Sequence, residues 1–261
     1  MPPLPIAIQL RSLRLPVRRA LEAASRLGVA AVEIDARTEL RPHELSQTGR
    51  REFRKLLENL NLRVAAIGFY TRRGYNVADD LERRVTATKD AMRLAQELGS
   101  AVVVNQVGQV PENTEATDWP TMLEALTDIG SFGNRIGATL AAETGSESGD
   151  DLARLVAALP DGALGITFNP GNLIINGFSP SDALTALGRN VIFVHAKDGV
   201  RDRARGRGDE VPLGRGSADF PALLGTLEDF AYRGYLCIER ERAQDPIFEI
   251  GQAVEYLASL C

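Results

Sequence analysis

Short apolar runs alternate with longer amphipathic segments along almost the whole chain. The short runs are rich in Val, Ile and Ala and end at polar residues, which is typical of strands in a buried parallel sheet. In the longer segments, apolar residues recur with the period of a helix. The pattern predicts eight strands, at residues 4–10, 31–35, 63–68, 101–105, 138–143, 163–168, 191–195 and 235–239. It also predicts eight helices, near residues 16–27, 50–60, 80–98, 119–136, 149–158, 180–187, 218–230 and 247–259.

Several of the predicted helices carry sequence signals at their ends. Ser179 precedes Pro180 and is expected to cap the amino terminus of the helix near 180–187. Ser217 is expected to cap the helix near 218–230 in the same way. Gly28 and Gly99 follow the ends of their helices, where glycine commonly takes the left-handed conformation.

The order of these elements predicts the fold. Strands that alternate with helices pair in parallel through right-handed crossovers, and eight such units close into a (β/α)8 TIM barrel. The first strand is not followed by the Gly-x-Gly-x-x-Gly motif of dinucleotide-binding sheets, so an open doubly wound sheet is the second choice. No linker, repeat or low-complexity tract divides the chain, and residues 1–261 are expected to form one α/β domain.

The composition is that of a globular protein with a large core, because 44% of the residues are hydrophobic and 25% are charged. Thirty Lys and Arg against 35 Asp and Glu give a net charge of −5, which argues against a nucleic-acid-binding surface. The sequence has no long apolar span and no secretory signal pattern, so we expect a cytoplasmic protein that does not bind membranes. The two cysteines, Cys237 and Cys261, show neither disulfide nor metal-ligand spacing.

Polar residues close the predicted strands in the second half of the chain, where a TIM barrel places its active site. They are Glu143, Asn169, His195 and Glu239. Glu143 and Asn169 are 26 residues apart, and so are Asn169 and His195. This spacing is about one strand–helix unit, which places the three residues at the same depth in the barrel. Two carboxylates, an amide oxygen and an imidazole suit a divalent cation such as Mn²⁺, Mg²⁺ or Co²⁺. Each residue alone is more commonly a hydrogen-bonded rim residue, but together they predict a metal site.

Motifs in the same half of the chain carry a family resemblance. They are 169-NPGNLI-174, 195-HAKD-198 and 214-GRGSADFPALL-224, followed by a strand that ends 236-LCIERE-241. With these motifs the chain resembles the sugar phosphate isomerase/epimerase superfamily of xylose isomerase-like TIM barrels. The resemblance covers most of the chain and is strongest from residue 138 onward.

The resemblance implies roles for single residues. In ketose epimerases of this superfamily a Glu, an Asp, a His and a second Glu hold a Mn²⁺-like ion, and the two glutamates move the substrate proton. Those positions are Glu143, Asn169, His195 and Glu239 here. Asn169 stands where the family has a carboxylate, which implies a weaker metal site. The resemblance also implies substrate contacts by Arg201 and by Asn172, which stands where the family has a histidine and cannot act as acid or base.

The expected chemistry is proton transfer next to a carbonyl group. A keto sugar or sugar phosphate would chelate the cation, which would stabilise the enediolate formed when the α-proton leaves. Glu143 and Glu239 are predicted to act as base and acid in an isomerase or epimerase. Lys197 is expected either to polarise a substrate oxygen or to form an ion pair at the rim.

Two other functions stay open. A lyase or hydratase would remove the same α-proton from a 3-keto sugar or glycoside and then expel or add a fragment. A degraded metal site would instead fit a non-catalytic carbohydrate-binding relative. The sequence does not decide between these functions, or whether the chain forms a homo-oligomer.

Two arginine-rich loops offer further contacts. Residues 199–216 either bind a substrate phosphate or form a solvated loop, and they carry Arg201, Arg203, Arg205, Arg207 and Arg215. Residues 69–76 form either a substrate lid or an exposed surface loop, and they carry Tyr70, Arg72, Arg73 and Tyr75. The first predicted strands end at Gln9, Glu33, Asp35 and Asn105. Glu33 and Asp35 could line the pocket floor or the substrate end, but rim hydrogen bonding is the expected use of at least one of them.

Overall fold

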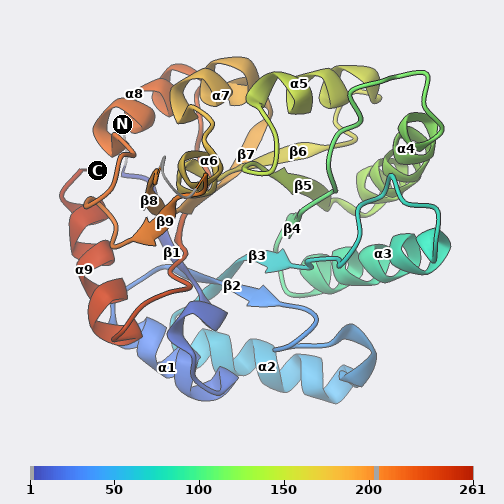
Figure 1. Ribbon diagram of the computed structural model, residues 1–261. Coiled ribbons are helices and arrows are strands. Elements are labelled where there is room, and N and C mark those ends of the chain that lie inside the picture. Colours follow the sequence, from blue (N-terminus) through green and yellow to red (C-terminus); the bar gives the residue numbers. More distant parts are fainter. Residues whose placement is uncertain (1–2, 203–205, 261) are drawn as a thin grey trace.

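The computed structural model describes residues 3–202 and 206–260 and shows a closed barrel of parallel strands surrounded by helices (Figure 1). Arg203, Arg205 and Cys261 lie outside these residues. Around the barrel the strands follow the order β1-β10-β7-β6-β5-β4-β3-β2, and every neighbouring pair is parallel. They are β1 (Ile6–Gln9), β2 (Ala31–Asp35), β3 (Arg63–Gly68), β4 (Val102–Asn105), β5 (Thr139–Glu143), β6 (Gly165–Phe168), β7 (Val191–Ala196) and β10 (Leu236–Ile238). The predicted (β/α)8 barrel is confirmed.

Helices connect these strands and cover the outside of the barrel. They are α1 (Val17–Arg26), α2 (Gln47–Asn59), α3 (Leu81–Glu97), α4 (Asp118–Ile136), α5 (Gly149–Ala158), α6 (Pro170–Asn176), α7 (Pro180–Leu187), α8 (Phe220–Asp229) and α9 (Pro246–Ala258). Short 3-10 turns are η1 (Leu10–Leu13), η2 (Pro42–Glu44) and η3 (Gly188–Asn190). All but α6 match helices predicted from the sequence. Among the described residues no helix combines the length and the apolarity that a membrane crossing requires.

The helix ends agree with the sequence signals except at α8. The Ser179 side chain accepts a hydrogen bond from the Asp182 amide at the start of α7, as predicted. Helix α8 is capped by Asp219, which accepts from the amide of Ala222, so the prediction of a Ser217 cap was wrong. The physical reason is that the amides of Ser217 and Ala218 donate to the Gly199 carbonyl and the Asp198 carboxylate, which holds both residues against β8. The helix therefore begins later.

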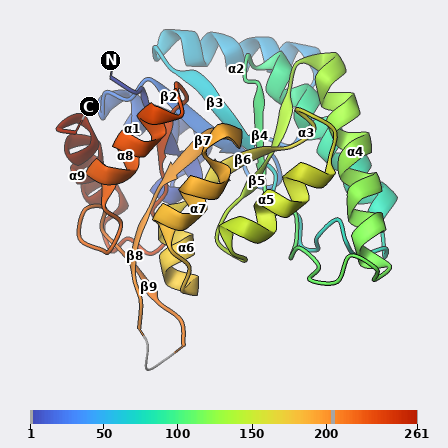
Figure 2. The same ribbon diagram turned by 90° about the horizontal axis from the view of Figure 1, so that it is seen from above.

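Three elements that follow β6 and β7 do not match any element predicted from the sequence. Helix α6 has only seven residues and opens with Pro170 and Gly171, so its periodicity is too short to detect. Strands β8 (Asp198–Val200) and β9 (Asp209–Val211) form an antiparallel hairpin that projects from the barrel (Figure 2). The loop predicted at 199–216 therefore overlaps both strands of this hairpin, and the Gly208 amide ties the segment to α6 by donating to the Ile175 carbonyl at 2.7 Å.

An apolar layer fills the interior of the barrel beneath the carboxyl ends of its strands. It consists of Ala7, Ala31, Ala65, Ala66, Val104, Phe193 and Cys237. Residues two positions further along a strand point to the same side, so a polar layer lies directly above it. This layer includes Gln9, Glu33, His195 and Glu239, all of which are buried. Strand pairing, which places Gln9 beside Glu33, fixes the common depth.

Candidate active site

The four side chains predicted to form a metal site meet at the carboxyl end of the barrel. Glu143 ends β5, Asn169 follows β6, His195 lies in β7 and Glu239 follows β10. The Nδ1 atom of His195 lies 2.6 Å from Oε1 of Glu143 and 3.5 Å from Oε2 of Glu239. The Asn169 amide nitrogen donates to the same two oxygens at 2.8 Å each. None of the four is more than 4% exposed, so they form one closed polar cluster.

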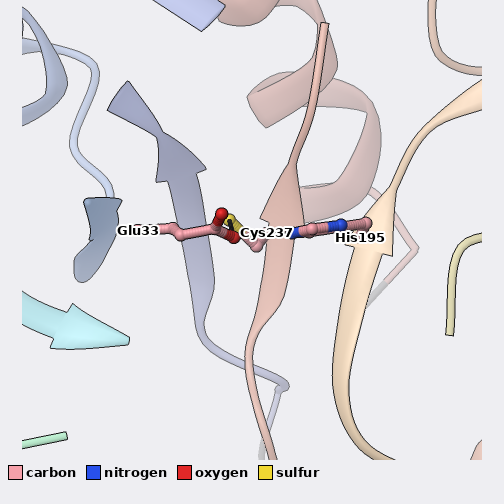
Figure 3. A group of neighbouring side chains, drawn as sticks. All are labelled: Glu33, His195 and Cys237. Atoms are coloured by element: carbon pink, nitrogen blue, oxygen red, sulfur yellow. Dashed lines mark hydrogen bonds and ion pairs between the residues drawn. The ribbon is translucent and has the colours of Figure 1, made fainter. Parts of the chain in front are cut away.

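Glu33 holds the opposite edge of the imidazole (Figure 3). Its Oε2 lies 2.6 Å from Nε2 of His195, and the Cys237 sulfur lies 3.8 Å from the same oxygen. A carboxylate that accepts the Nε2 proton fixes the orientation of the ring and directs Nδ1 toward Glu143. The sequence placed Glu33 only at the pocket floor. Its position two residues after Ala31 on an inward-facing strand was the available signal.

Hydrogen bonds from two further side chains fix the Glu33 carboxylate. The Gln9 amide nitrogen and the Tyr70 hydroxyl both donate to its Oε1 at 3.2 Å. The Ser12 hydroxyl in turn donates to the Gln9 amide oxygen at 3.0 Å. Both polar atoms of the Gln9 side chain thereby take part in the network that holds Glu33.

The charges of the cluster divide unequally between its members. Burial alone would lower the pKa of His195, but the carboxylates of Glu33 and Glu239 raise it well above its usual value. Burial alone would raise the pKa of Glu143, yet the hydrogen bond and the positive charge of His195 lower it to about 2. Burial raises the pKa of Glu239, against the attraction of Lys197 and His195. Two carboxylates at one site thus differ in proton affinity, as acid–base pairs do.

Ion pairs cover the cluster on its solvent side. Lys197 Nζ lies 3.5 Å from Oε1 of Glu239 and 3.0 Å from Oε2 of Glu241. Arg11 Nη2 lies 3.5 Å from the same Glu239 oxygen and 3.5 Å from Oε1 of Glu241. The Arg11 guanidinium also stacks over Tyr70, 4.3 Å from the ring centroid. Lys197 therefore forms a rim ion pair, one of its two predicted uses. Arg11 escaped prediction because it lies beyond the end of β1, in η1.

The remaining predicted residues lie outside the cluster. Asn172 is the third residue of α6, and its backbone amide donates to Oδ1 of Asn169 at 3.0 Å. Arg201 is exposed and donates to the Gly177 carbonyl at 2.7 Å, at the end of α6. The substrate contacts expected of both residues stay predictions. Tyr75 is fully buried and its hydroxyl lies 2.7 Å from that of Thr88, so neither the lid nor the surface loop describes it.

Three of these residues fit a divalent cation. One ligand atom each from Glu143, His195 and Glu239 lie within 4.8 Å of one another. Three protein ligands leave coordination positions for substrate oxygens, as catalytic metal sites do. Asn169 presents its nitrogen to this centre, because its oxygen caps α6. Its predicted ligand role would require the amide to turn over and would release the cap.

A second group of possible donors lies deeper in the barrel. It consists of Glu33, His195 and Cys237, which show the same close spacing of ligand atoms (Figure 3). Burial and the neighbouring charge of Glu33 raise the pKa of the Cys237 thiol well above its usual value, which opposes the thiolate that a metal needs. The Glu33 carboxylate is also satisfied by the imidazole. The upper group therefore fits a cation better.

Comparison with known proteins supports the same architecture. A family model described as Xylose isomerase-like TIM barrel matches residues 21–260. An uncharacterised protein of Methanocaldococcus jannaschii is 29% identical over 187 residues, which cover 66% of this chain and 62% of that protein. The match therefore spans less than two thirds of this archaeal relative. Inosose dehydratase of Clostridium beijerinckii is 22% identical over 228 residues, covering 74% of this chain and 73% of the enzyme.

Solved structures share the fold along almost the whole chain. A xylose isomerase domain protein from Planctomyces limnophilus superposes with a TM-score of 0.88 at 28% identity, covering 99% of this chain and 98% of that one. D-psicose 3-epimerase from Clostridium cellulolyticum H10 superposes with a TM-score of 0.80 at 12% identity, covering 98% and 99%. A xylose isomerase-like protein from Mycobacterium smegmatis in complex with magnesium has a TM-score of 0.79 at 18% identity, covering 98% and 96%. The last two show a common fold alone.

Proposed function

Because this chain belongs to the xylose isomerase-like TIM-barrel family, we propose that it is a sugar isomerase or epimerase that moves the α-proton of a keto sugar or sugar phosphate. One observation carries the proposal. Two buried carboxylates, Glu143 and Glu239, approach the same imidazole nitrogen from different strands of the barrel. Strand β10 lies on one side of β7, and β5 lies beyond β6 on the other. A substrate carbon between them would meet one carboxylate on each side.

Glu143, His195 and Glu239 are the residues that would hold a divalent cation, with Mn²⁺, Mg²⁺ and Co²⁺ as the candidates. Such a cation supplies Lewis acidity toward a carbonyl oxygen. Glu33 keeps the imidazole oriented for this role, because it accepts the proton on Nε2 and leaves Nδ1 for the centre. Loss of that orientation would weaken the site even though Glu33 is not a ligand.

The proton is moved by the residues of the chain. In one direction Glu143 takes the α-proton and the substrate becomes an enediolate, after which Glu239 returns a proton to the opposite face or to the neighbouring carbon. No atom is gained or lost by the substrate. Arg11 and Lys197 flank Glu239, and each lies 3.5 Å from its Oε1. Their side chains would keep water away from this carboxylate.

Dehydration of a keto sugar or cyclic keto polyol is the second candidate. The inosose dehydratase from C. beijerinckii favours it, because its similarity extends over 74% of this chain. The first step would again be removal of an α-proton, followed by loss of a β-hydroxyl as water. A protonated group is needed at the leaving oxygen, and the Lys197 ammonium beside Glu239 is the available donor.

Solvent-proton exchange tests the proposal. Keto sugars, their phosphates and cyclic keto polyols are incubated in D2O with the protein and Mn²⁺, and products are identified by NMR and mass spectrometry. We expect deuterium at the α-carbon with the wild type and a loss of about 10²-fold or more with Glu143→Gln or Glu239→Gln. The control Glu228→Gln alters an exposed residue of α8 and should keep full activity.

The product mass separates the two candidates. Unchanged mass apart from deuterium indicates an isomerase or epimerase, whereas loss of water indicates a dehydratase. Exchange that survives in Glu143→Gln would remove this residue from the mechanism. Sugar binding without exchange or elimination, with added Mn²⁺, Mg²⁺ and Co²⁺ alike, would identify a non-catalytic carbohydrate-binding protein instead.

A further inference from the structure

A strongly basic pocket of about 720 Å³ includes Ala36 and Phe69, which directly follow β2 and β3 at the carboxyl end of the barrel. It is formed by the connections that leave the arrowhead ends of β2 and β3, together with the first turns of α3 (Figure 1). Six arginines line it, against Asp80 and Asp90. The whole chain has a net charge of −5, so this positive charge is concentrated locally. None of the residues proposed to hold a cation or to move a proton lines this pocket.

Some of the arginines build the wall of the pocket. The Arg84 guanidinium donates to the main-chain carbonyls of Gly74, Val77 and Asp79 and so fixes the connection after β3. Arg37 Nη1 donates to the Tyr70 carbonyl at 2.5 Å and joins the two connections. Two further arginines are neutralised by acids, in the pairs Arg41–Glu44 at 2.8 Å and Arg73–Asp79 at 3.1 Å.

The remaining two, Arg72 and Arg83, stay available. Both are exposed, and no hydrogen bond or ion pair joins either guanidinium to another residue within 3–202 or 206–260. Asp90 pairs with Arg93 at 2.5 Å, and the charges of Arg37 and Arg84, which among the described residues contact only main-chain carbonyls, outweigh that of Asp80. The pocket thus holds a surplus of positive charge on a wall that Arg84 makes rigid. A soluble protein gains nothing in stability from such like charges, and an anionic ligand would offset their repulsion.

The chemistry of the lining selects the class of anion. Guanidinium groups match the oxygens of phosphate in bidentate pairs, and two uncompensated cations match a dianion better than a single carboxylate. The cavity is larger than a phosphate ion, and Ala36, Phe69 and Ala87 give it an apolar wall. We propose that this pocket binds a small organic phosphate, with Arg72 and Arg83 contacting the phosphate group.

Calorimetric titration at low salt tests the proposal without requiring turnover. Fructose 6-phosphate is the probe and fructose its neutral counterpart. We expect the phosphate ester to bind at least about tenfold more tightly than the neutral sugar, and added NaCl to weaken it. The double variant Arg72→Gln/Arg83→Gln should lower the affinity for the ester by about tenfold or more. Neither guanidinium has a hydrogen-bond or ion-pair partner in the part of the chain that the structure describes, so the melting temperature should not change.

The control is Arg19→Gln/Arg26→Gln, which removes the same charge from two exposed arginines of α1. Its affinity for the ester should equal that of the wild type. Equal weakening in both double variants, or equal binding of ester and neutral sugar, would overturn the proposal. Because binding is measured directly, this outcome is distinct from failure of the exchange experiment.

The source of the phosphate is settled by competition. If turnover of a neutral keto sugar is inhibited competitively by inorganic phosphate, the pocket receives the phosphate-bearing end of a substrate. If inorganic phosphate binds with the same dependence on Arg72 and Arg83 but does not compete, the pocket receives a separate ligand. Failure of inorganic phosphate and of the ester to bind at all would refute both forms of the proposal.

Discussion

Replacing Asn169 by aspartate separates the two uses of its side chain. The amide nitrogen donates to Glu143 and Glu239 at 2.8 Å each, while the amide oxygen accepts the Asn172 amide at 3.0 Å and caps α6. An aspartate oxygen can still accept that backbone hydrogen bond, so the cap persists. The two donated hydrogen bonds are lost, and a third carboxylate enters a fully buried cluster. The perturbation is therefore confined to the centre of the candidate site.

The size of the effect follows from these contacts. Hydrogen bonds to charged groups contribute about 1.5–3 kcal/mol each, so losing two costs about 3–6 kcal/mol before any charge repulsion. For a protein of this size each kcal/mol lowers the melting temperature by about 2–4 °C. We expect Asn169→Asp to melt at least about 6 °C below the wild type in EDTA at pH 8. A bound cation removes the repulsion, and at 100 times its dissociation constant it contributes about 2.7 kcal/mol.

Thermal unfolding followed by calorimetry, in EDTA and in Mn²⁺, measures both effects. Mn²⁺ should raise the melting temperature of Asn169→Asp more than that of the wild type, because the new oxygen turns from a source of repulsion into a ligand. The control Asn134→Asp makes the same change at an exposed position of α4 and should melt as the wild type does. A variant within about 2 °C of the wild type in EDTA would refute the bridging role of Asn169. Equal stabilisation of both proteins by Mn²⁺ would refute a ligand role for the new oxygen, and no stabilisation of either would refute the cation site.

Two further predictions concern stability. Asp198 is buried and accepts hydrogen bonds of 2.8–3.1 Å from the backbone amides of Gly199, Gly214, Gly216 and Ala218. Asp198→Ala should therefore lower the free energy of unfolding, measured in urea, by about 3 kcal/mol or more. A loss below about 1 kcal/mol would contradict this. Burial raises the pKa of Glu39 to about 7, despite its hydrogen bond from the Asp35 amide. Its protonated form therefore contributes stability that is present below pH 4.5 and lost as the pH rises to 7. The free energy of unfolding of Glu39→Gln should then exceed that of the wild type by up to about 3 kcal/mol at pH 8 and equal it at pH 4. A constant difference across this pH range would exclude the ionisation of Glu39 as its cause.

The strands and most helices could be predicted because their signals are local. Each barrel strand is a short apolar run, and each of the longer helices repeats its apolar positions over several turns. Helix α6 could not be found in this way because it has seven residues and depends on a single cap from Asn169. The start of α8 was misplaced at Ser217 because tertiary hydrogen bonds hold Ser217 and Ala218 against β8, and the cap falls to Asp219. Short elements are decided by contacts that the local pattern does not contain.

The candidate site divides in the same way. Glu143, His195 and Glu239 were identifiable because each follows an apolar strand, and a barrel places all such ends at one mouth. Arg11 lies beyond the end of its strand, so the strand-end rule could not find it. Glu33 was recognised as inward-facing, but nothing in the sequence states that it meets His195 across 162 residues.

The sequence by itself thus determined the barrel, the inward-facing polar layer and the types of donor that the layer offers. These follow from the periods of apolar residues, which the backbone geometry of strands and helices imposes on any chain. Only the tertiary structure decided which atoms face each other: Nε2 of His195 faces Glu33, and Asn169 turns its nitrogen rather than its oxygen to the centre. Rotamers and hydrogen-bond directions in a buried cluster are set jointly by all its members, which come together only when the barrel closes.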